Sequence, residues 1–374
     1  MDTRTTTQPI GRRINYSVIY RVIMCSVACA VIFAAVALKL TRYFAPENLE
    51  LMALDGYGSY TLPITLQEDE VMEPGKEGIL KNQIYVVEEK TQSLPETAPK
   101  KESNASPVYP ITETDLSAGA AQGDILIRDS DSGKSVDVRQ LLSAPYPEAL
   151  RDDGISRLSI AKEPLVLIVH THATESFVDQ GTISYTPGTE FRSEDTDKNM
   201  VAVGRVMAEV LNRKGIPTVH CETLHDLGDF NGAYDNSLAT VKKYLAQYPS
   251  VKYVFDLHRD AIIRETGEAL KPVCTIDGKP TAQVMTLVGT DAGGADHPLW
   301  LQNNMNLAVK LQHKLTTDYN GMARPINLRK LSFHQQYAPG YLLFEIGSCA
   351  NTLEEAKNAA ANLGNAVAEV INNS

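Results

Sequence analysis

The chain has 374 residues, 43% of them hydrophobic and 22% charged, so it is long and apolar enough to bury a substantial core. Its 46 acidic and 35 basic residues give a formal net charge of -11, which argues against a phosphate-binding surface and therefore against nucleic-acid binding. Five cysteines without a CxxC pair indicate neither a disulfide framework nor a thiolate zinc site.

Residues 18–40 are dominated by an uncharged apolar run that reaches the roughly 20 residues needed for a bilayer-spanning helix. More arginines precede this run than basic residues follow it closely. This charge pattern predicts a cytoplasmic N-terminus at residues 1–17, a single transmembrane helix at residues 18–40 and an extracytoplasmic remainder. The alternative is a cleaved signal peptide, but Lys39 and Arg42 stand where a cleavage motif should lie.

Residues 41–159 are predicted to form a membrane-proximal region and a low-complexity stalk. From Glu68 to Ala121 the sequence is rich in Glu, Pro, Lys, Ser and Thr, a composition that cannot bury enough apolar surface to fold. The pattern from Gly123 to Ser159 is ambiguous, and this segment is a candidate to dock on the domain that follows. The predicted folded domain spans residues 160–374.

From Pro164 onward, short apolar runs alternate with helical patterns. This alternation predicts an α/β fold with a mostly parallel sheet covered by helices on both faces. In chain order the pattern predicts strand 165–169, helix 200–211, strand 216–221, helix 234–248, strand 252–257, a turn at Asp277-Gly278, strand 282–288, helix 299–315, strand 340–345 and helix 353–370. Ligands of open α/β sheets bind at the carboxyl ends of the strands, and polar residues follow several of these strands.

His170, His172 and Glu175 lie close together directly after the first predicted strand. Two imidazoles and a carboxylate suit zinc, and a hydrolytic zinc site needs about three protein ligands and one open position. The alternative is a loop in which the histidines only bond backbone groups. A metal-independent hydrolysis by Ser176 with a neighbouring histidine lacks the glycine context of a nucleophile elbow.

His258 follows the predicted strand 252–257, so we expect it to emerge at the same sheet edge as His172. Asp256 or Asp260 is then suited to hold the ring nitrogen that does not bind metal. Arg259 is a candidate for substrate binding or an alternative ligand, and its competing interpretation is a surface ion pair with an acid.

Glu345 ends the buried run YLLF. A carboxylate in this position is either paired, poorly solvated with a raised pKa, or chemically active. We predict that Glu345 takes a proton during attack on an amide carbonyl and delivers it to the departing nitrogen. A structural salt bridge is the alternative.

Four segments, VLIVHTHATESF, FDLHRDA, QNNMNLAVKLQ and APGYLLFEIGSCANTLEEA, together resemble the stage II sporulation protein P family of endospore-forming bacteria. The resemblance covers roughly Leu165 to the C-terminus, and the predicted anchor and stalk fit the layout of the family. The catalytic domain of that family is in turn similar to zinc N-acetylmuramoyl-L-alanine amidases used in cell division.

This resemblance implies a Zn²⁺-dependent N-acetylmuramoyl-L-alanine amidase that acts on peptidoglycan, with an endopeptidase activity on stem-peptide crosslinks. It implies a role in septal wall thinning and engulfment during sporulation, a single-pass location in the cell membrane at the engulfing septum, and stage II sporulation proteins D and M as partners. The rival interpretation is a catalytically silent wall-binding scaffold that recruits other hydrolases.

Carried over residue by residue, the resemblance implies His172 and His258 as zinc ligands and Glu345 as the catalytic residue. The third ligand departs from the amidase pattern, which has a glutamate at the start of the first helix. Asp197 is our first candidate for that ligand and Glu175 the second. His170 takes the place of His172 if the first strand ends one pleat earlier.

Overall fold

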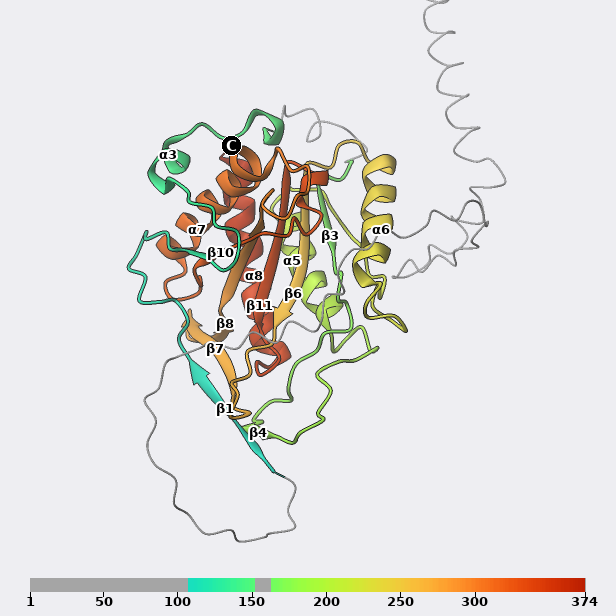
Figure 1. Cartoon of the computed structure of the whole chain (residues 1–374), viewed down its shortest axis with the longest axis vertical. Coiled ribbons are helices and arrows are strands. Elements are labelled where there is room, and N and C mark those ends of the chain that lie inside the picture. The colour runs from blue at the N-terminus through green and yellow to red at the C-terminus, as the bar shows by residue number, and fades with distance from the viewer. Residues whose placement is uncertain (1–106, 152–162, 374) are drawn as a thin grey trace, which may run out of the picture. The chain divides into compact units, whose positions relative to one another are not determined.

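The computed structural model describes residues 107–151 and 163–373 (Figure 1). The predicted cytoplasmic N-terminus, the predicted transmembrane helix and most of the predicted stalk lie outside these residues. Within the described ranges, no helix combines the length and the apolar character that crossing a bilayer requires.

A seven-stranded sheet forms the centre of the fold, with the strand order β2-β10-β9-β11-β6-β3-β5. Neighbouring strands pair in parallel except β9 and β11, which are antiparallel. The strands are β2 (Ile127–Asp129), β3 (Val166–Val169), β5 (Thr218–His220), β6 (Tyr253–Asp260), β9 (Val284–Gly289), β10 (Ile326–Arg329) and β11 (Gly340–Ser348). The mostly parallel α/β sheet expected from the sequence is therefore confirmed.

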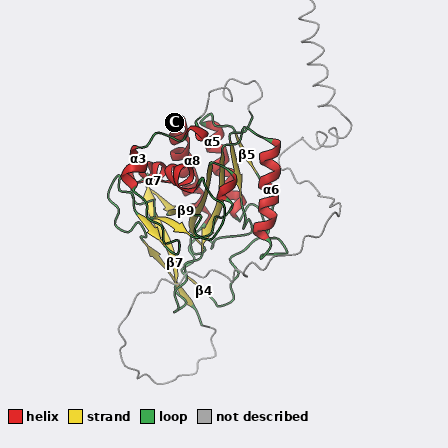
Figure 2. Ribbon diagram, turned by 45° about the horizontal axis from the view of Figure 1, so that its top comes forward, coloured by secondary structure: helices red, strands yellow, loops and turns green. Residues whose placement is uncertain are grey.

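Helices cover both faces of this sheet. On one face, α5 (Met200–Arg213), α7 (Asn306–Asp318) and α8 (Leu353–Asn372) share the larger apolar core with β6 and β11. On the other face, α6 (Ala233–Gln247) packs through Val241 onto β3, and it stands apart from the other three helices in Figure 2. The remaining helical segments are α3 (Val138–Ser143), a π-helix at Trp300–Met305 that leads into α7, and 3-10 turns at Glu148–Leu150 and Gln335–Tyr337.

Local sequence signals set the limits of the helices that flank the site. Asn199 caps α5 by accepting a hydrogen bond from the backbone N–H of Val201, and Gly215 leaves the helix with a φ of 82°. Thr352 and Glu355 form a capping box at the start of α8. These signals place α5 and α8 directly after the loops that carry the polar strand-end residues.

A second, four-stranded sheet has the order β4-β1-β7-β8. Its strands are β1 (Tyr109–Thr114), β4 (Ser184–Tyr185), β7 (Ala269–Ile276) and β8 (Lys279–Ala282). The turn between β7 and β8 has φ values of 49° at Asp277 and 74° at Gly278, as expected of a tight hairpin turn with both central residues left-handed.

The folded unit begins before residue 160, the boundary predicted from the sequence. β1 lies within the segment predicted as a stalk, yet it pairs in parallel with β7, and β2 pairs in parallel with β10. The docking expected of the segment from Gly123 onward is thus seen in β2, which adds an edge strand to the central sheet. Composition failed at β1 because a short strand with half of its residues exposed carries little apolar signal.

Candidate functional site

Three side chains singled out from the sequence meet at the carboxyl edge of the parallel strands. His172 lies in the loop after β3, and the centroids of the His172 and His258 rings are 5.5 Å apart. Glu345 of β11 is the register partner of His258 of β6. Because register partners on neighbouring strands project from the same face of a sheet, His258 and Glu345 lie side by side.

A β-bulge follows Glu345 immediately. The register between β11 and β6 shifts between Glu345 and Ser348, and Gly347 has a left-handed φ of 71°. A Cβ at Gly347 would lie 2.7 Å from Asn351 Oδ1, so this position requires glycine. Bulges re-aim side chains beside active sites, and this one ends the regular pairing next to Glu345.

Asp256, which is fully buried, joins the loop after β3 to His258. It accepts hydrogen bonds from the backbone N–H and the hydroxyl of Thr171, at 2.8 and 2.6 Å. Its Oδ1 lies 3.0 Å from His258 Nε2, but the atoms are not aligned as a hydrogen bond, so the contact is an ion pair. Burial opposes a charge on His258, but the carboxylates of Asp256 and Glu175 outweigh it and raise the pKa of His258 to about 10.

Glu175, rather than Asp197, lies beside the histidines. Glu175 Oε2 is 3.7 Å from His258 Nδ1, and only 9% of the Glu175 side chain is exposed. The side chain of Asp197 is 81% exposed and pairs with Arg205 at 2.6 Å. The structure thus brings the second candidate for the third ligand into the site and leaves the first candidate at the surface.

His170 lies apart from His172 and His258, against α5. It is fully buried, its Nε2 lies 2.7 Å from His220 Nε2, and its Nδ1 lies 3.1 Å from the Leu257 carbonyl oxygen. Burial and the neighbouring His220 lower the pKa of His170 to about 3. The structure therefore uses His170 in packing and presents His172 at the edge with His258.

Arg259 is buried, and its side chain hydrogen-bonds backbone carbonyl groups of the segment that follows β3. Its Nε donates to the Ser176 carbonyl at 3.1 Å, and its Nη2 donates to the Phe191 carbonyl at 2.6 Å. Its backbone N–H donates to Glu175 Oε2 at 3.1 Å. These contacts give Arg259 a structural role in place of the substrate contact suggested by the sequence, because its N–H groups already donate to acceptors inside the protein.

One oxygen of the Glu345 carboxyl group is not hydrogen-bonded within the described part of the chain. Its Oε2 is enclosed and has no hydrogen-bond partner among the described residues, and no ion pair to Glu345 is seen within them. Burial, helped by the nearby Asp260, raises the pKa of Glu345 to about 8 against the opposing effect of His258. A carboxyl group with a pKa near the working pH is well suited to accept and return a proton.

Aromatic and acidic side chains border His172. The Phe230 ring stacks on the imidazole with centroids 4.5 Å apart, and the Tyr234 ring meets it edge-on at 5.6 Å. Asp226 Oδ2 lies 3.8 Å from His172 Nδ1 and also pairs with Arg192 at 2.8 Å. Burial lowers the pKa of His172 to about 4, against the nearby Glu175, so the neutral imidazole that can bind a metal is the dominant form.

The donor set of this edge fits zinc, because two imidazoles and a carboxylate are available without a thiolate. His172 Nδ1, His258 Nε2 and Glu345 Oε2 are all buried without a hydrogen-bond partner, and such atoms call for an explanation in a native fold. In the described part of the chain no three His, Cys, Asp or Glu side chains are already drawn together in metal-binding geometry. Metal binding by His172, His258 and Glu175 therefore requires side-chain adjustment.

Sequence reasoning missed Arg324, a buried residue whose Nη2 donates to Asp260 Oδ2 at 2.8 Å. Asp260 lies two residues beyond His258, so the two side chains share a face of β6. Arg324 precedes β10, a four-residue strand that the apolar pattern did not reveal. No spacing in the sequence could have linked it to Asp260.

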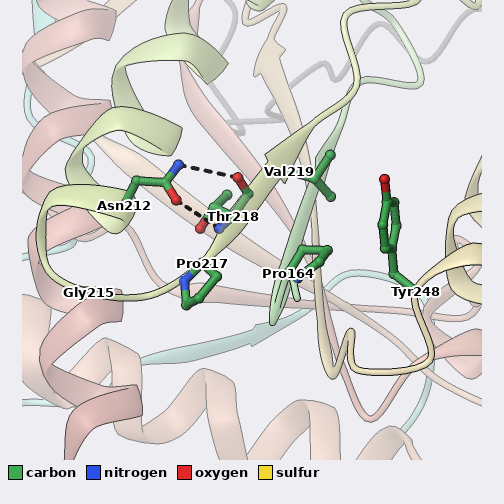
Figure 3. A pocket seen from close by; sticks show the side chains of 7 residues that line it. All are labelled: Pro164, Asn212, Gly215, Pro217, Thr218, Val219 and Tyr248. Carbon is green, nitrogen blue, oxygen red and sulfur yellow. Dashed lines mark hydrogen bonds between the residues drawn. The ribbon is translucent and has the colours of Figure 1, made fainter. Parts of the chain in front are cut away.

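A pocket of about 360 Å³ opens at the opposite edge of the sheet, where β3 and β5 begin (Figure 3). Asn212 bonds the backbone of Thr218 there, through Oδ1 at 3.0 Å and Nδ2 at 3.2 Å. The pocket is lined by Pro164, Asn212, Gly215, Pro217, Thr218, Val219 and Tyr248. This lining offers no carboxylate and no imidazole, whereas the histidines and carboxylates of the candidate site lie at the other edge of the sheet.

Fold and site together define an α/β protein with a histidine-carboxylate cluster at the carboxyl edge of its central sheet. Residues 67–371 match the stage II sporulation protein P family, and the chain belongs to that family. It is 28% identical over 217 residues to stage II sporulation protein P of Bacillus subtilis (strain 168), an alignment that covers 55% of this chain and 50% of the relative. The chain therefore matches about half the length of that relative.

Solved amidase structures show a distant likeness. N-acetylmuramoyl-L-alanine amidase AmiC2 of Nostoc punctiforme is 12% identical with a TM-score of 0.32, over 56% of this chain and 96% of that one. The CwlD amidase from Clostridioides difficile, solved in complex with the GerS lipoprotein, is 13% identical with a TM-score of 0.31, over 55% of this chain and 93% of that one. Likeness at this level carries no conclusion about activity.

Proposed function

We propose that this protein is a zinc-dependent N-acetylmuramoyl-L-alanine amidase that cleaves the amide between the glycan and the stem peptide of peptidoglycan. The main support is the pairing of His258 and Glu345 on neighbouring strands, with the His172 ring beside them. Zinc-dependent amide hydrolysis uses imidazole ligands and a carboxyl group that exchanges protons within reach of one another. The substrate class rests on the family resemblance.

In this proposal His172, His258 and Glu175 hold the zinc ion. When bound, zinc supplies Lewis acidity that polarises the amide carbonyl and favours deprotonation of water. Asp256 keeps the loop after β3 and the His258 ring in place through its contacts with Thr171 and His258.

Glu345 moves the proton. Its unpartnered Oε2 accepts a proton from the attacking water and then delivers it to the amide nitrogen as the stem peptide departs. In the metal-free chain burial raises the pKa of Glu345 to about 8, and a carboxyl group that titrates near the working pH can both accept and return a proton.

The proposal is tested by digesting purified peptidoglycan with the full-length chain in detergent, with and without a chelator, and identifying the products by mass. We expect release of intact stem peptides that stops with chelator and returns with added zinc. The matched variant Glu345→Gln should retain zinc, measured by elemental analysis, while its turnover falls by about 10²-fold or more. Wall binding with no peptide release under any metal condition would instead favour the silent scaffold.

We assign the proposed endopeptidase cleavage of stem-peptide crosslinks to the same cluster. Glu345→Gln should then abolish both cleavages together, and crosslink cleavage that survived this substitution would place the second activity elsewhere. From the resemblance we further propose that the protein acts in septal wall thinning during engulfment, on the extracytoplasmic side of the membrane, with stage II sporulation proteins D and M. Co-purification of these two proteins with the full-length chain from sporulating cells tests the partnership.

A further inference from the structure

Arg324 reaches across the end of β11. Its backbone N–H donates to the Val284 carbonyl at 2.8 Å, and Val284 adjoins Met285, the register partner of Glu345 on β9. Its guanidinium meets Asp260 on β6, on the other side of β11. The ion pair between Arg324 and Asp260 therefore passes over the strand end that carries Glu345.

One edge of the Arg324 guanidinium is unused. Nη2 is paired with Asp260, but Nη1 is buried without a hydrogen-bond partner, although only 10% of the side chain is exposed. Glu345 Oε2 is also without a partner on the same strand end. A buried guanidinium N–H left unpaired is costly, so this donor is placed for an acceptor that arrives with a ligand.

The acid nearest to this donor already has a partner. Asp260 pairs with Nη2 of Arg324 at 2.8 Å, so its charge is compensated on the other edge of the guanidinium. Nη1 is therefore left to a different acceptor. The planar guanidinium fork is the side-chain group best matched to a carboxylate.

We infer that Arg324 binds a carboxylate of the stem peptide through Nη1 and so positions peptides whose second residue carries a free α-carboxylate in preference to an α-carboxamide. The inference rests on the proposed function for its substrate class. Arg324 is then a positioning and specificity residue, and Glu345 remains the group that moves the proton.

Two soluble probes that differ only in this α group test the inference: N-acetylmuramoyl-L-alanyl-γ-D-glutamyl-L-lysine and N-acetylmuramoyl-L-alanyl-D-isoglutaminyl-L-lysine. Binding of each probe to the full-length, zinc-loaded Glu345→Gln chain is measured by calorimetry, and cleavage by the chain with Glu345 intact is measured by kcat/KM. We expect the acid probe to be preferred about tenfold or more in both measurements. Adding Arg324→Gln should reduce the preference to about twofold or less, mainly by weakening binding of the acid probe.

Removing Arg324 alone leaves Asp260 buried without its partner. The double substitution Arg324→Gln with Asp260→Asn removes both charges and should show the same loss of preference in a folded chain, checked by circular dichroism. Arg324→Lys keeps a charge beside Asp260 without the fork and should lose most of the preference. Arg264→Gln, which breaks an exposed ion pair with Glu268, is the control that should keep it.

The outcomes separate this inference from the amidase proposal. Equal binding of both probes, binding of neither, or a preference that survives every Arg324 variant would overturn the inference even if both probes were cleaved. An Arg324-dependent preference in binding, without cleavage by the unsubstituted chain, would support the inference and count against the amidase reaction.

Discussion

Glu175 and Asp197 differ most clearly in what surrounds their carboxylates, and this difference predicts their roles in metal binding. Glu175 is enclosed beside His258, whereas Asp197 is exposed and paired with Arg205. Glu175→Gln should lower zinc affinity by about tenfold or more, because a neutral amide is a poor zinc ligand. Competition with a fluorescent zinc chelator measures the affinity.

Asp197→Asn is the matched control for that substitution and should change zinc affinity by no more than about twofold, because its partner is a surface arginine. If Asp197→Asn lowered the affinity and Glu175→Gln did not, the order taken from the sequence would be restored and our ligand set would be wrong.

Sequence reasoning found His172, His258 and Glu345 because each follows a strong apolar strand, and strand ends of a parallel sheet converge. The resemblance ranked Asp197 above Glu175, because the amidases have a glutamate ligand at the start of the first helix, and a sequence does not show which way a loop carboxylate points. Sequence reasoning missed Arg324 because the reach of this side chain across β11 depends on strand order in the folded sheet. Polar groups at ends of elements are thus predictable from a sequence, and pairings between distant loops are not.

Among the elements, α5 can pack closely against the His170 and His220 side chains because Gly204 has no side chain. A Cβ there would lie 2.5 Å from Nε2 of both His170 and His220. Glycine to alanine in a helix ordinarily stabilises by about 0.5–1 kcal/mol. At Gly204 the clash should reverse the sign, and we expect Gly204→Ala to lower the free energy of unfolding by about 1–3 kcal/mol.

Chemical denaturation of the full-length chain measures this change. Glu209→Ala on the exposed side of the same helix is the control and should stay within about 0.5 kcal/mol of the original chain. An increase in stability for Gly204→Ala would mean that α5 can move away from the histidine pair at no cost.

Element prediction succeeded wherever a long periodic pattern was present, as for α5, α6 and α8. It failed at β1, β4 and β10, which are short strands of two to six residues whose pairing partners are distant in sequence. It also fused the π-helix at Trp300–Met305 with α7, since apolar spacing alone does not separate the two.

For the molecule as a whole, the buried ion pair of the site makes stability depend on pH in the metal-free state. The pKa of His258 is raised from 6.5 to about 10, so its contribution is fully present below pH 6.5 and is lost as pH rises through about 10. The raised pKa of Glu345 acts in the same direction between 4.5 and about 8. His170 and His220 have pKa values lowered to about 3 and act only below pH 6.5.

We therefore expect the urea midpoint of the chelated chain to fall steadily from pH 6.5 to pH 10. Asp256→Asn should flatten this slope, because His258 loses the carboxylate that raises its pKa. Glu345→Gln should flatten it only below about pH 8. A midpoint that rose with pH over this window would contradict the assignment of charge to His258.

β11 is the last strand of the central sheet along the chain, and it is also the middle one, between β9 and β6. A chain emerging amino end first can form β6-β3-β5 on one side and β2-β10-β9 on the other, but no strand of one group pairs with a strand of the other until β11 enters. Glu345 arrives with that same strand. Closure of the sheet and arrival of the proposed proton carrier are therefore a single event, so an incompletely made chain has neither a finished core nor the side chain to which we assign the proton transfer.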